Sequence, residues 1–438
     1  MNEPTGLALQ ARYLRPGTLQ LGAPPPLSVY VHLPWCLKKC PYCDFNSHEW
    51  PARQAPAGAA AAEQPLRFQP PGGPAGHRGA PAGQALDTAT EQAYLDALRA
   101  DLEQSLPLVW GRTVQTVFIG GGTPSLFSPE AVNRLLSDLR ALLPLAPAAE
   151  VTMEANPGTF ERDRFRAFRA AGVTRLSVGV QSFDDVKLRA LGRVHDGAQA
   201  RAAMAEAAEC FDTFNLDLMY ALPGQTLAEL REDVATALSF QPPHLSLYHL
   251  TLEPNTVFAR QPPVLPDDDT SAEMMDTLVA MAAEAGLRRY EVSAYARAGH
   301  RCAHNLNYWQ FGDYLGIGAG AHGKLSFPHR VVRTIKWREP ATYMREALAG
   351  RATSKEEEVQ RKALPFEFML NALRLREGFE AALFTERTGL PPSAIAEGLA
   401  QAQARGLIEA LDSPVTGRHW RPTDRGFDFL SDLQGLFL

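Results

Sequence analysis

Short apolar segments alternate with amphipathic segments along the first part of the chain. Six apolar segments have the length and the β-branched and aromatic content of strands: residues 28–33, 116–120, 150–155, 175–180, 214–220 and 244–250. Segments with helical periodicity lie between them, at residues 91–105, 128–143, 161–172 and 198–210. Because crossover helices connect strands that run in the same direction, this order predicts a parallel sheet. Glycine and polar residues follow the strand ends, which favours a full or partial (β/α) barrel with its site at those ends.

The rest of the chain forms two further regions. In the first, we expect a helix at 268–286, a strand at 289–296 and a glycine-rich stretch at 314–326. In the second, we expect helices at 367–375, 379–389 and 392–409, a hairpin at 413–423 and a final helix. The predicted fold is α/β: a partial (β/α)6 barrel over 28–254, a barrel extension over 255–350 and a mostly helical, winged-helix-like module over 355–438.

Two segments lack these patterns. Residues 1–27 are aperiodic and predict a loosely held N-terminal arm. Residues 50–87 are dominated by Ala, Pro, Gly and Gln, and such a segment cannot bury enough apolar surface to offset its ordering entropy. We therefore expect a flexible, protease-sensitive insertion at 50–87.

Composition narrows the class of protein. The chain has 438 residues, of which 45% are hydrophobic and 21% charged, as in globular proteins. A net charge of −6 argues against a general nucleic-acid binder. No apolar run reaches the roughly 20 residues that span a bilayer, and the N-terminus lacks the pattern of a secretory signal. Five cysteines, three of them within eight residues, indicate metal or redox chemistry in a reducing compartment, and we expect the cytoplasm.

The cysteine triplet carries the clearest chemistry. Cys36, Cys40 and Cys43 follow the spacing C-x3-C-x2-C. Three thiolates can ligate three irons of a [4Fe–4S] cluster and leave the fourth iron open for another ligand. The alternative is a zinc loop completed by His32 or His48. Zinc sites usually pair two C-x2-C turns, and the sequence has no second one.

A glycine-rich turn follows the second predicted strand. In FIGGGTPS, residues 118–125, three glycines let the backbone approach a ligand, and free amides can hold a carboxylate or an amine. Together with the cysteines, this turn resembles the radical S-adenosylmethionine (SAM) superfamily. The resemblance implies that SAM binds the open iron through its amine and carboxylate. It also implies that the reduced cluster splits SAM into methionine and a 5′-deoxyadenosyl radical.

Further motifs narrow the resemblance. YVHLPWC, CPYCDFNS, GGGTPS, MEANPGT, RLSVGVQSF, LGRVHD, NLDLMYALPGQT and HNLNYW occur in that order. They are similar to the coproporphyrinogen III dehydrogenase-like group, and within it to haem chaperones, over about residues 28–430 without the insertion. The resemblance implies three cofactors, a [4Fe–4S] cluster, SAM and haem, and a haem-accepting partner protein. The sequence leaves the oligomeric state open, with a homodimer as one option.

The resemblance also implies which residues contact SAM. Tyr30 and Tyr42 correspond to aromatic contacts beside the cluster, Gly121 and Gly122 to backbone contacts, and Glu154 to a carboxylate near the amine or ribose. The remaining positions that match the family's cofactor-binding residues are Thr123, Gln181, Arg193 and Asp217.

Two of these residues could instead have purely structural roles. Asp217 could cap a turn at the end of its strand. Arg193 could be a surface cation paired with Asp196.

The motif HNLNYW, residues 304–309, is the candidate haem site. A neutral imidazole ligates haem iron, and Tyr308 and Trp309 could offer flat faces to a porphyrin. The resemblance implies haem binding at His304. The alternatives are a buried histidine satisfied by the backbone, or ligation by the thiolate of Cys302. Cys210 is expected to be a core cysteine.

These observations predict a haem chaperone that binds a cluster, SAM and haem and transfers the haem to an acceptor. The first alternative is an oxygen-independent coproporphyrinogen III dehydrogenase. That enzyme has another cysteine two positions after the third, where this chain has Phe45, and a longer N-terminal arm. The second alternative is an iron–sulfur sensor that binds DNA through the C-terminal module, but no basic recognition helix is evident. Its phosphate contacts would be Arg405, Arg418, Arg421 and Arg425.

Overall fold

The computed structural model describes residues 13–50, 86–159, 163–413 and 417–438. The first twelve residues of the expected arm and almost all of the expected insertion at 50–87 therefore lie outside the described residues.

Within the described ranges, twelve strands form one large sheet in the order β14-β13-β12-β11-β1-β4-β5-β6-β7-β8-β10-β9. Its parallel part consists of β11 (Asp313–Ile317), β1 (Leu27–Leu33), β4 (Val114–Gly121), β5 (Leu145–Ala155), β6 (Arg175–Gln181), β7 (Phe214–Tyr220) and β8 (His244–His249). The two edges are antiparallel and contain β12 (His322–Phe327), β13 (Arg330–Lys336) and β14 (Thr353–Glu358) on one side, and β10 (Ala294–Ala296) and β9 (Arg288–Arg289) on the other.

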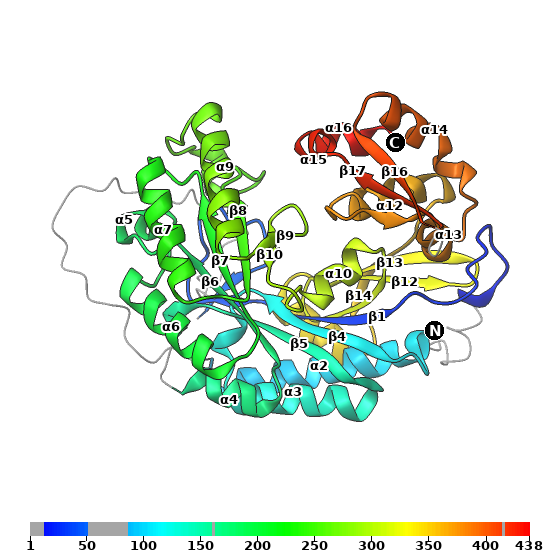
Figure 1. Cartoon of the computed structure of the whole chain (residues 1–438). Coiled ribbons are helices and arrows are strands. Elements are labelled where there is room, and N and C mark those ends of the chain that lie inside the picture. The colour runs from blue at the N-terminus through cyan, green and yellow to red at the C-terminus, as the bar shows by residue number, and fades with distance from the viewer. Residues whose placement is uncertain (1–12, 51–85, 160–162, 414–416) are drawn as a thin grey trace.

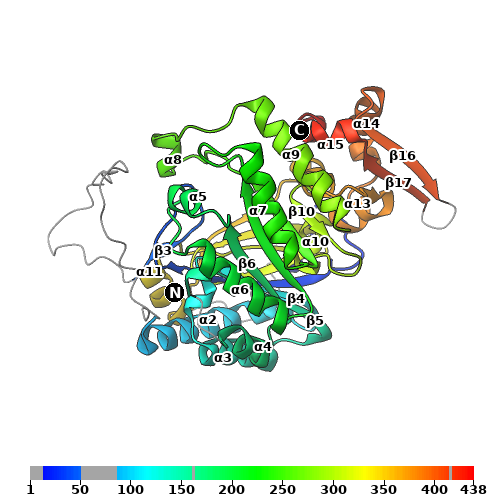
Figure 2. The same cartoon turned by 60° about the vertical axis from the view of Figure 1, so that its left-hand side comes forward.

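The six expected strands are adjacent and parallel, and the sheet is open at both edges, so the predicted partial barrel is confirmed. Figures 1 and 2 show the sheet curved, with helices along its outer face. These helices are α2 (Thr88–Val109), α3 (Pro129–Leu142), α4 (Arg164–Ala171), α5 (Asp185–Ala190), α6 (Gly197–Cys210) and α7 (Leu227–Ser239). A short turn of 3-10 helix, Pro124–Leu126, precedes α3, and a second one, Pro157–Thr159, follows β5.

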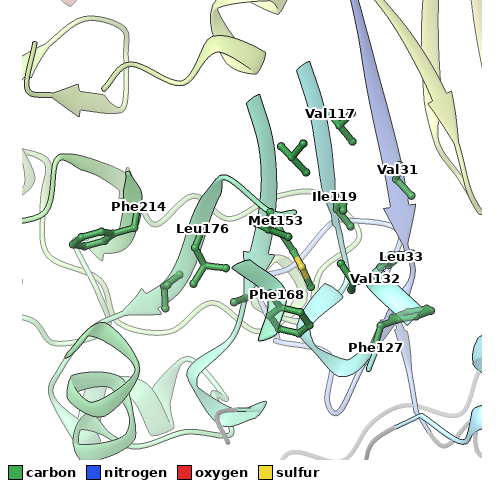
Figure 3. Packing of buried hydrophobic residues seen from close by; sticks show 14 of the residues in the cluster. Val31, Leu33, Val117, Ile119, Phe127, Val132, Met153, Phe168, Leu176 and Phe214 are labelled. Carbon is green, nitrogen blue, oxygen red and sulfur yellow. The ribbon is translucent and has the colours of Figure 1, made fainter. Parts of the chain in front are cut away.

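The core lies between the outer face of the sheet and these helices. Figure 3 shows strand side chains such as Ile119 and Met153 packed near Val132 of α3 and Phe168 of α4, all of them buried. The helix starts are set by side-chain caps. The Ser128 hydroxyl accepts from the amide of Ala131 at 3.1 Å, and α6 and α7 begin with capping boxes. Apolar strand faces and capped helices therefore leave the inner face of the sheet for the site.

Residues 13–26 of the expected arm are mostly exposed but are anchored to the rest of the chain by a few buried side chains. Leu19 and Leu21 are buried in the apolar cluster of the C-terminal module, and the amide of Leu21 donates to the carbonyl of Pro328 at 2.9 Å. The prediction of a loose arm was therefore wrong for this part. Isolated leucines carry no periodicity, yet each buries a large apolar side chain.

The extension differs from prediction at one strand. It contains α8 (Val257–Arg260), α9 (Asp268–Glu284), α10 (Ala303–Trp309) and α11 (Pro340–Leu348). The strand expected at 289–296 is split into β9 and β10. The Glu291 carboxylate accepts from the amide and hydroxyl of Ser293, which makes a turn between them. The glycine-rich stretch 314–326 forms β11 and β12 around a turn.

The C-terminal module contains α12 (Leu364–Ala372), α13 (Ala381–Thr388), α14 (Ser393–Ala404), α15 (Asp424–Asp428), α16 (Leu430–Gly435) and a turn of 3-10 helix at Arg361–Ala363. A small sheet has the order β15 (Phe379–Glu380), β17 (Gly417–Pro422), β16 (Ile408–Ser413). Phe379 and Glu380, expected in a helix, pair instead with β17.

The helix expected at 392–409 ends early, at Ala404. Gly406 has φ +67°, and the amide of Leu407 donates to the carbonyl of Ala402, as in a Schellman cap. The following residues form β16, which pairs with β17, so the hairpin begins at Ile408 and not at Ser413 as expected.

Candidate cofactor site

The cysteine loop leaves the C-terminal end of β1. It is closed by the short strands β2 (Trp35–Cys36) and β3 (His48–Glu49), which pair in parallel. Asn46 fastens the loop to the rest of the barrel, because its amide donates to the carbonyls of Ala319 and Arg338, each at 2.9 Å. The three cysteines are therefore held at the end of the barrel where the fold predicts a site.

Each cysteine sulfur has its own polar neighbour. The Thr123 hydroxyl donates to Cys36 Sγ at 3.4 Å, and Arg193 Nη1 donates to Cys40 Sγ at 3.6 Å. The Ser47 hydroxyl oxygen lies 3.6 Å from Cys43 Sγ. Burial raises the pKa of Cys36 to about 11. Donors of this kind stabilise sulfur that carries negative charge, as the sulfurs of cluster ligands do.

The histidines proposed to complete a zinc site are placed otherwise. His32 uses both ring nitrogens, one with the Tyr30 hydroxyl at 3.0 Å and one with the carbonyl of Asn46 at 2.9 Å. His48 does not line the cavity described below. Among the described residues, no group of three or more His, Cys, Asp or Glu side chains is arranged to hold a single metal ion. The donor set at this loop is thus three cysteines.

A cavity of about 530 Å³ opens beside the cysteines and extends along the inner face of the sheet. Most of the expected cofactor-binding residues line it together: Cys36, Cys40, Cys43, Tyr42, Gly121, Gly122, Thr123, Glu154, Gln181, Arg193 and Asp217. Tyr30 and His304 do not. Tyr30 lies behind Phe118, with 6.2 Å between the ring centroids.

The glycine turn is packed against the cysteine loop. A Cβ on Gly121 would lie 2.6 Å from the ring of His32, and φ is +117° there. A Cβ on Gly122 would lie 2.6 Å from the carbonyl oxygen of Trp35. The sequence suggested that these glycines admit a ligand to the backbone. In the structure, the space beside each is already taken by the protein, although both residues still line the cavity.

Two carboxyl groups share the cavity. Burial raises the pKa of Glu154 to about 8, helped by the nearby charge of Asp217 and opposed by the amide of Gly121, which donates to Glu154 Oε2 at 3.1 Å. Burial also raises the pKa of Asp217, against the hydrogen bonds that it accepts from Asn215 at 2.8 Å and Ser177 at 3.2 Å. Asp217 therefore points into the cavity and does not cap a turn.

Arg193 also points inward. Its Nη2 donates to the carbonyl of Gly179 at 2.7 Å, and Nη1 lies 3.5 Å from the Tyr42 hydroxyl. Asp196, the surface partner considered from the sequence, instead caps α6. Gln181 at the end of β6 has φ +69°, a conformation that costs a non-glycine residue roughly 1–2 kcal/mol. This strained backbone conformation therefore occurs in the wall of the cavity.

The HNLNYW motif lies in α10, and its histidine turns away from the cavity. His304 is 2% exposed, and its Nδ1 lies 2.8 Å from the Thr116 hydroxyl. Its Nε2 has no hydrogen-bond partner in the described part of the chain. Burial lowers the pKa of His304 to about 3, so the ring is neutral. The residues of this segment that line the cavity are Cys302 and Asn305.

The aromatic faces of the motif are already covered. Tyr308 stacks on Tyr314 with 4.2 Å between centroids, and the guanidinium of Arg374 lies 4.2 Å from the ring centroid of Trp309. At least one face of each ring is therefore used within the protein and is not open to a porphyrin.

Most of a polar stripe along the inner face of the sheet was missed; only Glu154 and Asp217 were expected. From Thr152 in β5 and throughout β6 to β8, every second residue lines the cavity, and many of these residues are polar: Thr152, Glu154, Arg175, Ser177, Asn215, Asp217, His244, Ser246 and Tyr248. Buried parallel strands are usually apolar on both faces. Polar residues at every second position of such strands were therefore the signal that could have revealed the cavity.

Comparisons with known proteins agree with this geometry. Residues 30–237 match the family model of the radical SAM superfamily, and residues 359–429 match that of the HemN C-terminal domain. The chain is 45% identical over 417 residues to the heme chaperone HemW of Escherichia coli, covering 94% of this chain and 98% of that one. It is 42% identical to the heme chaperone HemW of Haemophilus influenzae, with the same coverage. The chain belongs to the HemW family.

A solved structure agrees with the fold of this HemW-family chain. Coproporphyrinogen III oxidase (HemN) from Escherichia coli, described as a radical SAM enzyme, matches with a TM-score of 0.74 over 100% of this chain and 93% of that one. Its sequence identity is 23%, so this likeness concerns the fold alone. None of the described helices has both the length and the apolarity to cross a bilayer.

Proposed function

We propose that this protein is a haem chaperone that binds a [4Fe–4S] cluster, SAM and haem and passes the haem to an acceptor protein. The observation that carries the proposal is the 45% identity to a heme chaperone HemW over nearly the whole of both chains. The chain also has Phe45 at the position where the dehydrogenase has a further cysteine.

The residues at the cysteine loop fit the cofactors. Cys36, Cys40 and Cys43 would hold the cluster, with a polar neighbour for each sulfur from Thr123, Arg193 and Ser47. When bound, a reduced cluster supplies the electron that splits SAM.

The glycine turn and Glu154 lie beside the cysteines on the same cavity. Glu154 would orient SAM through its carboxyl group. The amides of the turn, which the sequence suggested were free, already donate: Gly121 to Glu154, Gly122 to the carbonyl of Leu33 and Thr123 to the carbonyl of Trp35. Because the pKa of Glu154 is raised to about 8, this carboxyl can hold a proton near neutral pH and donate it in a hydrogen bond.

The far end of the same cavity is the candidate haem region. Cys302 and Asn305 line it, and His304 follows on the same helix with a neutral ring and an unpartnered Nε2. His304 would ligate iron only after Phe118, whose ring centroid lies 5.0 Å away, or α10 itself has moved. A movement of Phe118 or α10 when haem binds would suit a protein that must also release its haem.

Product analysis separates this function from that of the dehydrogenase. Anaerobically reconstituted protein would be incubated with coproporphyrinogen III, SAM and a reductant, with a haem titration in parallel. We expect haem binding and no conversion of propionates to vinyl groups. Turnover of coproporphyrinogen by protein that binds no haem would overturn the proposal in favour of the dehydrogenase.

The iron ligand can be identified with two substitutions. If His304 is the ligand, His304→Ala should shift the Soret band or weaken haem binding about tenfold or more, which is roughly 1.4 kcal/mol. Cys302→Ala should then leave both unchanged. If only Cys302→Ala shifts the Soret band or weakens haem binding, Cys302 is the iron ligand. If neither variant changes haem binding, another residue is the ligand.

We also propose a cytoplasmic location. All five cysteines are free, and three of them must stay reduced to ligate a cluster. The acceptor is then expected among proteins of the same compartment.

A further inference from the structure

Two buried polar groups of the cavity wall have no partner within the described residues. Arg175 at the start of β6 is 2% exposed, and Thr152, opposite it on β5, is 1% exposed. Arg175 Nη1 donates to the carbonyl of His300 at 3.0 Å. Arg175 Nη2 and the hydroxyl of Thr152 have no hydrogen-bond partner, and both side chains line the cavity.

These groups lie at the end of the cavity remote from the cysteines. Arg175 precedes Gly179, the contact of Arg193, by four residues on β6. A strand rises about 3.3 Å per residue, so this separation is about 13 Å along the sheet. The thiol of Cys302 donates to Glu150 at 3.6 Å, and Glu150 precedes Thr152 by two residues on β5. The start of α10 therefore adjoins the same end.

The charge of Arg175 has no counter-ion in contact. No carboxylate of the described chain forms an ion pair with it. The charge of Arg175 opposes the rise in the pKa of Asp217 that burial causes, but without a contact between the two groups, and the hydrogen bonds of Asp217 and Glu150 go to other partners. Asp217 accepts from Asn215 and Ser177, and Glu150 accepts from the amides of Ala303 and His304 at 3.2 and 3.1 Å. A buried cation without a paired anion is unfavourable, so a binding role for this group is the simplest reason to keep it.

We propose that Arg175 and Thr152 form a subsite for a carboxylate, and that this carboxylate is a propionate of the tetrapyrrole. The inference rests on the proposed haem function. A guanidinium and a hydroxyl can donate together to one carboxylate. SAM also carries a carboxylate, but the glycine turn expected to hold it lies at the opposite end of the cavity. Propionate binding here would place the tetrapyrrole beside the start of α10.

The test compares Arg175→Gln and Thr152→Val with the parent. Arg169→Gln, which changes an arginine of outer helix α4 that pairs with Asp212, is the matched control. Reconstituted protein would be titrated with haem, haem dimethyl ester and SAM. Arg175→Gln should weaken haem binding about tenfold or more, and Thr152→Val about threefold. The dimethyl ester and SAM should bind equally to all variants. Arg175→Gln removes a buried charge without an ion-pair partner but also the hydrogen bond to the carbonyl of His300, so the melting temperature of each variant is recorded to confirm that it folds.

Other outcomes overturn the inference. Unchanged haem binding in both variants would make Arg175 a structural residue, and a loss confined to SAM would assign the carboxylate to SAM. If Arg175→Gln does not fold, Thr152→Val alone tests the subsite. The ratio of its affinity for haem to its affinity for the dimethyl ester should then be lower than in the parent, and an unchanged ratio would overturn the inference.

If the parent binds no haem, the proposed function fails, and coproporphyrin III, followed by fluorescence, tests the subsite separately. Binding of coproporphyrin III that is weakened by Arg175→Gln would support the carboxylate subsite. If coproporphyrin III does not bind, or binds equally to Arg175→Gln, the subsite proposal is wrong.

Discussion

Replacing Gly121 by alanine tests how the glycine turn and the cysteine loop fit together. A Cβ there would meet three ring atoms of His32 at 2.6–2.9 Å. The ring cannot easily move, because Tyr30 and Asn46 hold its two nitrogens. The backbone penalty at φ +117° is roughly 1–2 kcal/mol, and overpacking adds about 1–3 kcal/mol. We therefore expect Gly121→Ala to lower the free energy of unfolding by about 2–5 kcal/mol.

Gly286→Ala is the matched control for this substitution. Gly286 has φ +80° and no atom within 4 Å of an added Cβ, so it should show the backbone penalty alone. Denaturant unfolding of the three proteins would be followed by tryptophan fluorescence, with cluster content and SAM binding measured on the folded samples. A double-mutant cycle with His32→Ala isolates the contact, and Gly121→Ala should cost about 1–3 kcal/mol less in that background. Equal losses for Gly121→Ala and Gly286→Ala, or simple additivity with His32→Ala, would refute the reasoning.

Two further predictions concern the cysteines and Glu154. Alanine at Cys36, Cys40 or Cys43 should abolish a content of about four irons and four sulfides per chain, whereas Cys210→Ala should leave it intact, and stoichiometric zinc without iron would contradict this assignment. The folded state holds the proton of Glu154 up to a pKa of about 8, against 4.5 for the free group, so this residue's contribution to stability is lost as pH rises through that window. Glu154→Gln should therefore gain stability relative to the parent between pH 5 and pH 9 in thermal melts, and a constant difference would show that Glu154 is ionised throughout.

The strand–helix order and the cysteine motif could be predicted from sequence because each depends on local pattern. Parallel strands bring Gly121, Glu154, Gln181, Arg193 and Asp217 to one cavity, so residues far apart in the chain were correctly grouped by their place after or within strands.

The side-chain packing around these residues could not be predicted from the sequence, because it does not depend on local pattern. That His32 fills the space beside Gly121 depends on the side-chain arrangement of two loops. The direction of His304 depends on how α10 rotates against β4, which a six-residue motif does not determine. Leu19 and Leu21 bury against segments more than 300 residues away, so no local pattern marks them.

The central claim, that this chain carries haem on a radical SAM scaffold, is tested most directly by haem titration of anaerobically reconstituted protein. The titration would be repeated with a variant that lacks Cys36, Cys40 and Cys43. The account predicts about one haem per chain in both proteins, with the same Soret spectrum, because the proposed haem region lies at the opposite end of the cavity from the cysteines. No saturable binding, or a haem spectrum lost with the three cysteines, would contradict it.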